Sequence, residues 1–165
     1  MLVDQLVILQ KETHKGVGLG NEKRFVSNDI KGFELEFKSH EEIIVHFINQ
    51  MNLHAIDLYL DKKRTYQDLP KSRFVILLGN AFEKFNEAGD TKLIPVKGYC
   101  NGFTCPNFRK NGYTFKGNNS QSFMNLIIEN EDDFVSDIFQ CSYFESPENG
   151  DFRNQVLIDD WLEKN

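Results

Sequence analysis

Apolar residues along this chain recur at two different spacings, one in each half. Between residues 39 and 89 they recur every three or four positions, the spacing that gives a helix one apolar face. From residue 91 to residue 145 they alternate with polar residues in short runs, which is typical of strands with one buried face. The pattern therefore predicts a helical section followed by a strand section.

The helical section predicts three helices with recognisable ends. Ser39 and Asn52 are placed to cap the first two, and the second is expected to run to about Lys62. The third follows Pro70, which suits a first helical turn, and ends at Gly89, which can adopt the left-handed conformation that closes a helix. The apolar stripe of this third helix consists of Phe74, Leu77, Leu78, Ala81, Phe82 and Phe85. Such a stripe must pack on another apolar surface.

The strand section contains four strand-like runs. They span residues 93–99, 113–115, 122–129 and 134–144. The segment Gly117-Asn-Asn-Ser120 predicts a tight hairpin turn, because glycine and asparagine tolerate the positive φ angles of such turns. A second polar turn, over residues 130–133, separates the last two runs. Short connections of this kind favour antiparallel neighbours.

Helices that precede a meander of strands predict an α+β domain, with the helices packed on one face of a curved antiparallel β-sheet of about four to five strands. A length of 165 residues suits a single domain. Residues 1–38 carry little pattern, apart from a strand-like run at Phe33–Phe37 and glycines at 16, 18 and 20 that lack dinucleotide-binding spacing. Residues 155–164 predict a short amphipathic C-terminal helix.

The order of these elements, from about Ser39 to Phe144, resembles the nuclear-transport-factor-2-like superfamily. The resemblance lies in the element order and not in a residue motif. It implies a cone-shaped fold in which helices precede a strongly curved sheet around a pocket. Because that superfamily contains both enzymes and binding modules, the resemblance implies no particular active-site residue.

The net charge and hydropathy of the chain argue against two classes of partner, nucleic acids and membranes. The formal net charge of −6 argues against a nucleic-acid partner, since proteins that bind the phosphate backbone usually carry a basic excess. The basic run Lys62-Lys63-Arg64 is short and is interpreted as a solvated helix end. No apolar run approaches the ~20 residues that span a bilayer, and the first residues lack the pattern of a signal peptide. We therefore expect a cytoplasmic domain with no membrane partner.

Three cysteines in the strand section are the only constellation that suggests metal or redox chemistry. Cys100 and Cys105 are separated by four residues, a gap found in structural zinc sites, and Cys141 could supply a third thiolate. No histidine lies in the second half of the chain, so the fourth ligand of zinc would be a carboxylate, water, or one of the four histidines His14, His40, His46 and His54. Water would imply an open, potentially catalytic site. Two other interpretations remain open: separate thiols that pack as small apolar groups, and a redox disulfide.

Asp137 is the candidate for acid–base chemistry. It lies between Val135 and Phe139 in the fourth run, and burial would raise the pKa of its carboxyl towards the range of a catalytic base. Tight hairpins would bring Tyr113 and Asn125 near it, so these three residues are predicted to line one concave ligand-binding surface. The alternation also permits the opposite sheet face to be the core, which would leave this surface in solvent.

Sequence motifs for common catalytic sites are absent: there is no nucleophile elbow, no phosphate-binding loop and no paired-histidine metal motif. We therefore expect a non-enzymatic domain that binds a partner protein or a small ligand on its curved sheet. A small hydrolase or isomerase with Asp137 as its base is one alternative. An acidic inhibitor or immunity-type protein that neutralises a basic partner is another.

Overall fold

The computed structural model of the chain describes residues 24–26, 34–36, 39–132 and 134–159. Within these ranges, the helices are α2 (His40–Asn49), α3 (Leu53–Tyr59) and α4 (Lys71–Glu87), and they precede a five-stranded antiparallel sheet. The α+β class is therefore confirmed. None of the helices in the described ranges has the length and apolar character needed to cross a membrane.

The sheet has the strand order β8-β7-β6-β5-β9. Its strands are β5 (Leu93–Cys100), β6 (Asn111–Gly117), β7 (Phe123–Glu131), β8 (Phe134–Phe139) and β9 (Phe144–Glu145). The first four are consecutive antiparallel neighbours. The two predicted turns account for the pairing of β6 with β7 and of β7 with β8, whereas the loop of residues 101–110 joins β5 to β6. Among the described residues the two edge strands, β8 and β9, do not pair with each other, so the sheet stays open.

Two short ribbons complete the described strands. One pairs β1 (Arg24–Val26) with β2 (Glu34–Glu36), and the other pairs β3 (Thr65–Tyr66) with β4 (Leu69–Pro70). The first ribbon contains the middle of the strand predicted at Phe33–Phe37. The glycines at 16, 18 and 20 lie outside the described residues.

The helix ends follow the sequence signals closely. Ser39, Asn52 and Pro70 are the N-cap residues of the three helices. The side chains of Ser39 and Asn52 each accept a hydrogen bond from the backbone N–H three residues later, at 3.2 and 3.1 Å. Gly89 follows α4 with a φ of +97°, a left-handed conformation. Only α3 differs, because it ends at Tyr59, before the basic run.

The main core lies between the helices and one face of the sheet, and α4 supplies much of it. Phe74, Leu78 and Phe85 of α4 are fully buried, and so are Phe115 of β6 and Met124 of β7. Full burial of one such side chain stabilises the fold by about 1.5–3 kcal/mol. The apolar stripe of α4 therefore packs on the sheet, as its spacing predicts.

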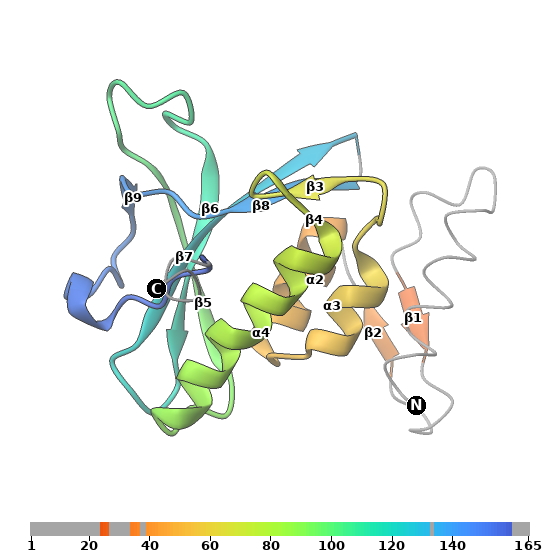
Figure 1. Cartoon of the computed structure of the whole chain (residues 1–165), viewed down its shortest axis with the longest axis horizontal. Coiled ribbons are helices and arrows are strands. Elements are labelled where there is room, and N and C mark those ends of the chain that lie inside the picture. The colour runs from red at the N-terminus through yellow and green to blue at the C-terminus, as the bar shows by residue number, and fades with distance from the viewer. Residues whose placement is uncertain (1–23, 27–33, 37–38, 133, 160–165) are drawn as a thin grey trace.

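The other sheet face carries a second, smaller core, because β7 is buried on both sides. Ile127 of β7 packs there with Cys100, Cys141 and Phe144. The chain that follows β8 runs to the far edge of the sheet, where β9 pairs with β5, away from the helices (Figure 1). The sheet is thus enclosed at β7 and is not an open concave surface there.

The fourth predicted strand is wrong beyond Phe139. The chain leaves the β7 edge at Gln140 and crosses to the opposite edge, where β9 pairs only with Tyr99 and Cys100 of β5. The cause is long-range hydrogen bonding: the backbone N–H of Gln140 donates to the side chain of Gln67 at 2.9 Å instead of continuing the ladder. Cys141 therefore lies in a turn and not on a strand face.

The predicted helix over residues 155–164 is not formed in its described part. A 3₁₀-helix spans Phe152–Asn154, and the following residues are extended, with the N–H of Val156 donating to the carbonyl of Phe123 at 2.7 Å. Val156 and Ile158 are buried whereas Leu157 is exposed, which is the period of a strand. Residues 160–164 lie outside the described residues.

A buried carboxylate joins the end of α4 to the β6–β7 turn. Asp90 accepts hydrogen bonds from the N–H of Asn119 at 2.8 Å and from the hydroxyl of Ser120 at 2.6 Å. Gly117 lies so close that a Cβ at this position would overlap the Asp90 carboxylate. Glycine is therefore needed at position 117 for packing and not for a positive φ, since Gly89 is the glycine with a positive φ among the described residues.

A three-thiol cluster as candidate metal centre

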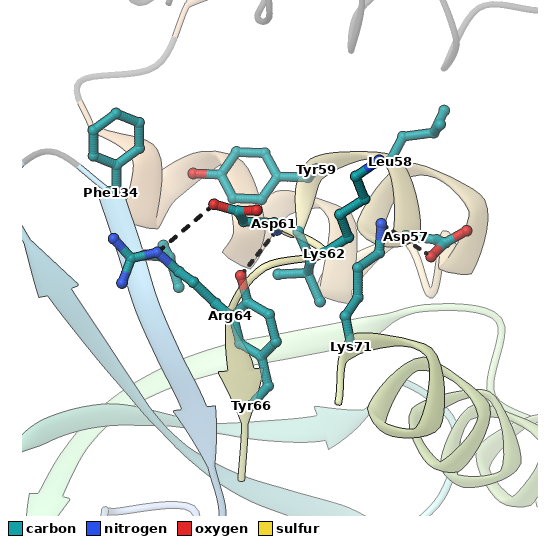
Figure 2. Close-up of a pocket in the computed structure, with 11 residues that line it drawn as sticks. Asp57, Leu58, Tyr59, Asp61, Lys62, Arg64, Tyr66, Lys71 and Phe134 are labelled. Atoms are coloured by element: carbon teal, nitrogen blue, oxygen red, sulfur yellow. Dashed lines mark hydrogen bonds and ion pairs between the residues drawn. The ribbon is translucent and has the colours of Figure 1, made fainter. Parts of the chain in front are cut away.

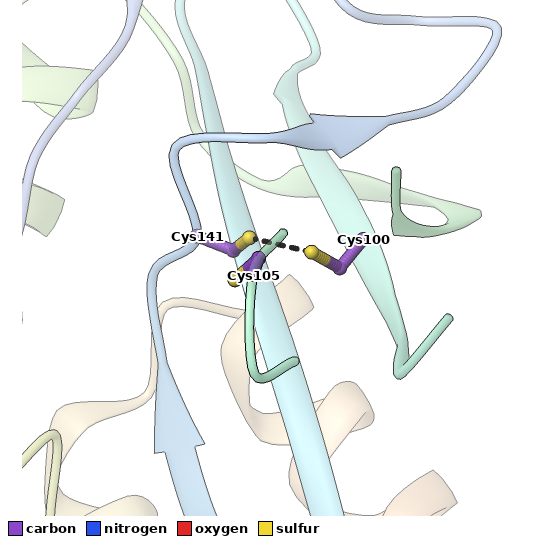
Figure 3. A group of neighbouring side chains, drawn as sticks. All are labelled: Cys100, Cys105 and Cys141. Atoms are coloured by element: carbon purple, nitrogen blue, oxygen red, sulfur yellow. Dashed lines mark hydrogen bonds between the residues drawn. The ribbon is translucent and has the colours of Figure 1, made fainter. Parts of the chain in front are cut away.

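The three cysteines come together at the β9 edge of the sheet (Figure 3). Cys100 ends β5, Cys105 lies in the loop between β5 and β6, and Cys141 lies in the turn between β8 and β9. Their Sγ atoms all lie within 4.8 Å of one another, and those of Cys100 and Cys141 are 3.2 Å apart. The structure thus unites all three residues that the sequence singled out.

Backbone hydrogen bonds fold the loop of residues 101–110 back over the end of β5. The N–H of Cys100 donates to the carbonyl of Lys110 at 2.9 Å, and the N–H of Arg109 donates to the carbonyl of Cys100 at 2.8 Å. Within the loop, the N–H of Cys105 donates to the carbonyl of Gly102 at 2.9 Å and makes a tight turn. This turn directs Cys105 back towards Cys100.

Gly102 lets the loop approach the turn that carries Cys141. A Cβ at this position would lie 2.7 Å from the ring of Tyr143 and 2.9 Å from the Cβ of Cys105, closer than real Cβ contacts. The N–H of Asn101 also donates to the carbonyl of Tyr143 at 2.9 Å. The two segments are therefore held together independently of any bond between their cysteines.

The thiols differ in burial and in acidity. Cys100 is fully buried, Cys141 nearly so, and Cys105 is partly exposed. Several effects act on the pKa of Cys100. Burial is the largest single effect and raises this pKa, but four others lower it: the N–H of Gly102, the thiols of Cys141 and Cys105, and the charge of Lys110. Together these four hold the pKa below its usual value. Burial, and then the hydrogen bond to Cys100, raise the pKa of Cys141 to about 12. Cys100 therefore loses its proton more readily than Cys141.

This donor set suits a soft or borderline metal ion. Thiolates are preferred ligands of zinc, and Zn–S bonds of about 2.3 Å place the sulfur atoms of a shared ion close to the spacing found here. Among the described residues, no histidine or carboxylate joins the three sulfur atoms within that spacing. The cluster thus offers three ligands and leaves one coordination position to a molecule from solution.

Comparisons of the chain with protein-family models, with curated proteins and with solved structures find no match. The fold and the site therefore define the class of protein by themselves. It is an α+β domain with a three-cysteine cluster that could bind a metal ion at one edge of its sheet. Its function must be argued from the geometry of this cluster and of the surfaces around it.

The predicted ligand-binding surface is not assembled. Tyr113 faces the helices, where its hydroxyl donates to Glu41 at 2.8 Å. Asn125 faces the opposite side of the sheet, where its side chain accepts from Thr114 at 2.6 Å and donates to Asn149 at 2.8 Å. The register explains the difference: Tyr113 lies opposite Leu126, so that Asn125, one residue away, points to the other face.

The Asp137 carboxylate accepts hydrogen bonds from the backbone around it. One of its carboxylate oxygens accepts hydrogen bonds from the N–H groups of Gln67, at 3.0 Å, and Ile138, at 2.8 Å. Burial raises its pKa, the two N–H groups lower it, and the charges of Glu129 and Asp68 raise it further, so the net shift is upward. The carboxylate therefore fastens the β3–β4 turn to β8 and does not share a surface with Tyr113.

A cavity that sequence reasoning missed lies beside the end of α3 (Figure 2). Its volume of about 480 Å³ is in the range of small-molecule sites. Tyr66 lies at its base, with Arg64 on one side and Lys71 on the other, as Figure 2 shows. The available signal was the basic run after α3, which the sequence analysis interpreted as a solvated helix end.

Basic and acidic side chains form ion pairs around this cavity. Arg64 lies 3.9 Å from Asp61 and 3.4 Å from Glu131, and Lys71 lies 3.4 Å from Asp57. These pairs are partly exposed, and such pairs contribute little stability, so their partners can exchange at small cost. The described residues that line the cavity include three basic and two acidic side chains, and Glu131, which pairs with Arg64, adds a third acidic side chain.

Proposed function

We propose that this protein binds one zinc ion through Cys100, Cys105 and Cys141. The observation that carries the proposal is the convergence of three Sγ atoms within 4.8 Å from three separate segments of the chain. The ion would join the loop of residues 101–110 to the end of β5 and to the turn before β9. Its role is structural support, because two of the three thiols are buried in the smaller core.

The size of that smaller core explains why a metal would be useful there. Its buried members are Cys100, Ile127, Cys141 and Phe144, far fewer than in the core under the helices. A small apolar cluster stabilises a loop weakly, and a metal ion adds bonds that the unfolded chain lacks. Three thiolates and Zn²⁺ carry a net charge of −1, which the nearby Lys110 offsets.

The proposal also sets conditions on the protein's environment. Cys141 has a pKa of about 12 and must lose its proton to become a ligand, so zinc binding releases protons and weakens as the pH falls. The thiols must stay reduced to bind the ion. A reducing compartment such as the cytosol meets that condition.

The test is elemental analysis of protein purified without a metal-binding tag, paired with titration of free thiols. We expect about one zinc per chain, masked thiols, and a lower melting temperature after chelation. Cys105→Ser should lose the zinc, whereas Thr104→Ala, an exposed neighbour in the same loop, should retain it. Metal-free protein with three free thiols and a melting temperature that ignores chelator would refute the site.

The cavity beside α3 supports a second candidate function, the binding of a small organic anion. Its volume, the partly exposed ion pairs of Arg64 and Lys71, and Tyr66 at its base together suit a ligand with a carboxylate and a flat apolar part. Benzoate is a simple probe of this class. Titration followed by NMR should shift residues 57–71 and 134–135, and Arg64→Gln should abolish the shifts. Shifts elsewhere, or none at millimolar benzoate, would contradict the assignment.

The resemblance to the nuclear-transport-factor-2-like superfamily remains a proposal about the fold. Its support is the order of helices before a strand meander and the packing of those helices on one sheet face. The space between helices and sheet is filled by side chains such as Phe74, Phe85 and Phe115. A ligand site on this scaffold would therefore lie at the edge, where the cavity is found, and not in the middle of a cone.

A further inference from the structure

We propose that the cluster is also an oxidation site, at which a hydroperoxide converts Cys100 and Cys141 into a disulfide and leaves Cys105 as a thiol. The proposal deepens the zinc function and concerns the same site in its metal-free state. The geometry carries it: the two Sγ atoms are 3.2 Å apart, and the thiol of Cys141 donates its hydrogen bond to the sulfur of Cys100. Nucleophile and resolving thiol are thus already in contact.

The chemistry has two steps. The Cys100 thiolate attacks one oxygen of the hydroperoxide, the O–O bond breaks, and Cys100 becomes a sulfenic acid as hydroxide or alkoxide leaves and takes up a proton. Cys141 then attacks the Cys100 sulfur, an S–S bond forms and the S–O bond breaks. The departing hydroxide takes the Cys141 proton and leaves as water. Two thiols lose two electrons and two protons, and the peroxide is reduced by the same two electrons.

The roles of the two cysteines follow from their surroundings. The thiol of Cys141 donates its hydrogen bond to the sulfur of Cys100, so the Cys100 sulfur is the acceptor and the nucleophile that is oxidised first. Cys141, the donor of that hydrogen bond, keeps its proton until the Cys100 sulfur is oxidised. The S–S bond of a disulfide is about 2 Å long, so closure requires only a short approach of two side chains that already face each other (Figure 3).

Oxidation also depends on solvent access to the thiol cluster and competes with zinc binding. Cys105 is the partly exposed member, so the cluster opens to solvent on its side, and hydrogen peroxide is small enough to use that route. The disulfide removes two of the three zinc ligands. Oxidation and zinc binding therefore exclude each other, and bound zinc should protect Cys100 from peroxide.

The experiment treats reduced, metal-free protein with hydrogen peroxide, alkylates the remaining thiols and maps the peptides by mass spectrometry. We expect a Cys100–Cys141 linkage and an alkylated Cys105. Cys105→Ser should form the same linkage. Cys141→Ser should stop at a sulfenic acid on Cys100, trapped by dimedone. Three alkylated cysteines after peroxide, or a linkage that includes Cys105, would overturn the proposal. The peptide map of the wild-type protein tests the proposal even if Cys141→Ser fails to fold.

Failure of the two proposals can be told apart. Zinc titration of the reduced protein tests the metal site alone, and peroxide treatment of the metal-free protein tests the disulfide alone. A chain that forms the linkage and never binds zinc would refute only the metal function. A chain that binds zinc and keeps three free thiols after peroxide would refute only the oxidation site. If both hold, zinc added before peroxide should slow the linkage several-fold.

Discussion

Asp137 shows what one half-buried carboxylate does in this fold. It stands beside Glu129 on the neighbouring strand, accepts two backbone hydrogen bonds and has a raised pKa. A raised pKa in the folded state means that folding favours the protonated form. Its contribution to stability is fully present below the ordinary value of 3.8 and is lost as the pH rises through the folded pKa.

Asp137→Asn should therefore be at least as stable as the wild type at pH 7, because an amide oxygen accepts the same two N–H groups without a buried charge. Urea unfolding at pH 4 and pH 7 would measure this, and the variant should lose part of the decline in stability between those values. Asp137→Ala is the matched control. It leaves the N–H of Gln67 without an acceptor and should cost about 1–3 kcal/mol. An Asn variant as unstable as the Ala variant at pH 7 would contradict this account.

Glycine is required at positions 89 and 117 for two different reasons, backbone conformation at Gly89 and close packing at Gly117. Gly89 has a φ of +97° and open space around its missing Cβ, so Gly89→Ala should cost only the left-handed strain, about 1–2 kcal/mol. Gly117→Ala should cost more, because its Cβ would displace the buried Asp90 carboxylate from its hydrogen bonds. Chemical denaturation of both variants would test the order, and a larger loss at Gly89 would reverse it.

At the scale of elements, α4 is the most strongly determined part of the fold. Its stripe, its first turn at Pro70 and its end at Gly89 are local signals, and the structure contains all three. The hairpins from β5 to β8 are likewise local and were predictable. The departure at Gln140 was not, because its cause, the side chain of Gln67, lies 73 positions away in the sequence.

The same distinction applies to the candidate site. The cysteines could be singled out because metal-ligand chemistry limits the residue types, and the loop spacing places Cys100 near Cys105. That Cys141 joins them depends on the crossing of the chain to the β5 edge. The surface of Tyr113 and Asn125 failed for a simpler reason, since a step of one residue in a strand changes the sheet face.

Leu78→Asp tests the role of α4 as an element. Leu78 has no exposed surface, so the charge would be buried without a partner, and we expect the domain to unfold. Ile76→Asp, on the same helix with 52 % of its surface exposed, should change stability little. Circular dichroism melting of both proteins would decide. A cooperatively melting Leu78→Asp protein would show that the core is assigned wrongly.

At the scale of the whole molecule, two cores of unequal size share one sheet. The larger lies under the helices, and the smaller contains Cys100 and Cys141 on the other face of β7. Apart from Ile127 in the middle of β7, the buried residues of the smaller core lie in a turn, in the short strand β9 and at the end of β5, so its loss should open that part of the protein and leave the helical core folded.

Hydrogen exchange followed by mass spectrometry would measure this division. Cys105→Ser should lose protection in residues 100–110 and 141–145, whereas α4 should keep the protection of the wild type. Thr104→Ala would serve as the control for a substitution in the same loop. Equal loss of protection in α4 would mean that the two cores unfold as one unit, contrary to the division inferred here.

The short pairing of β9 with β5 has a consequence for behaviour at high concentration. Among the described residues, β9 covers only Tyr99 and Cys100, so the edge from Leu93 to Gly98 has no strand beside it. Pro95 offers no N–H to an incoming strand, and Lys97 places a charge on the same edge. Pro95→Val should therefore promote concentration-dependent self-association, visible by light scattering. One proline thus helps to keep neighbouring molecules from joining their sheets into a shared, insoluble one.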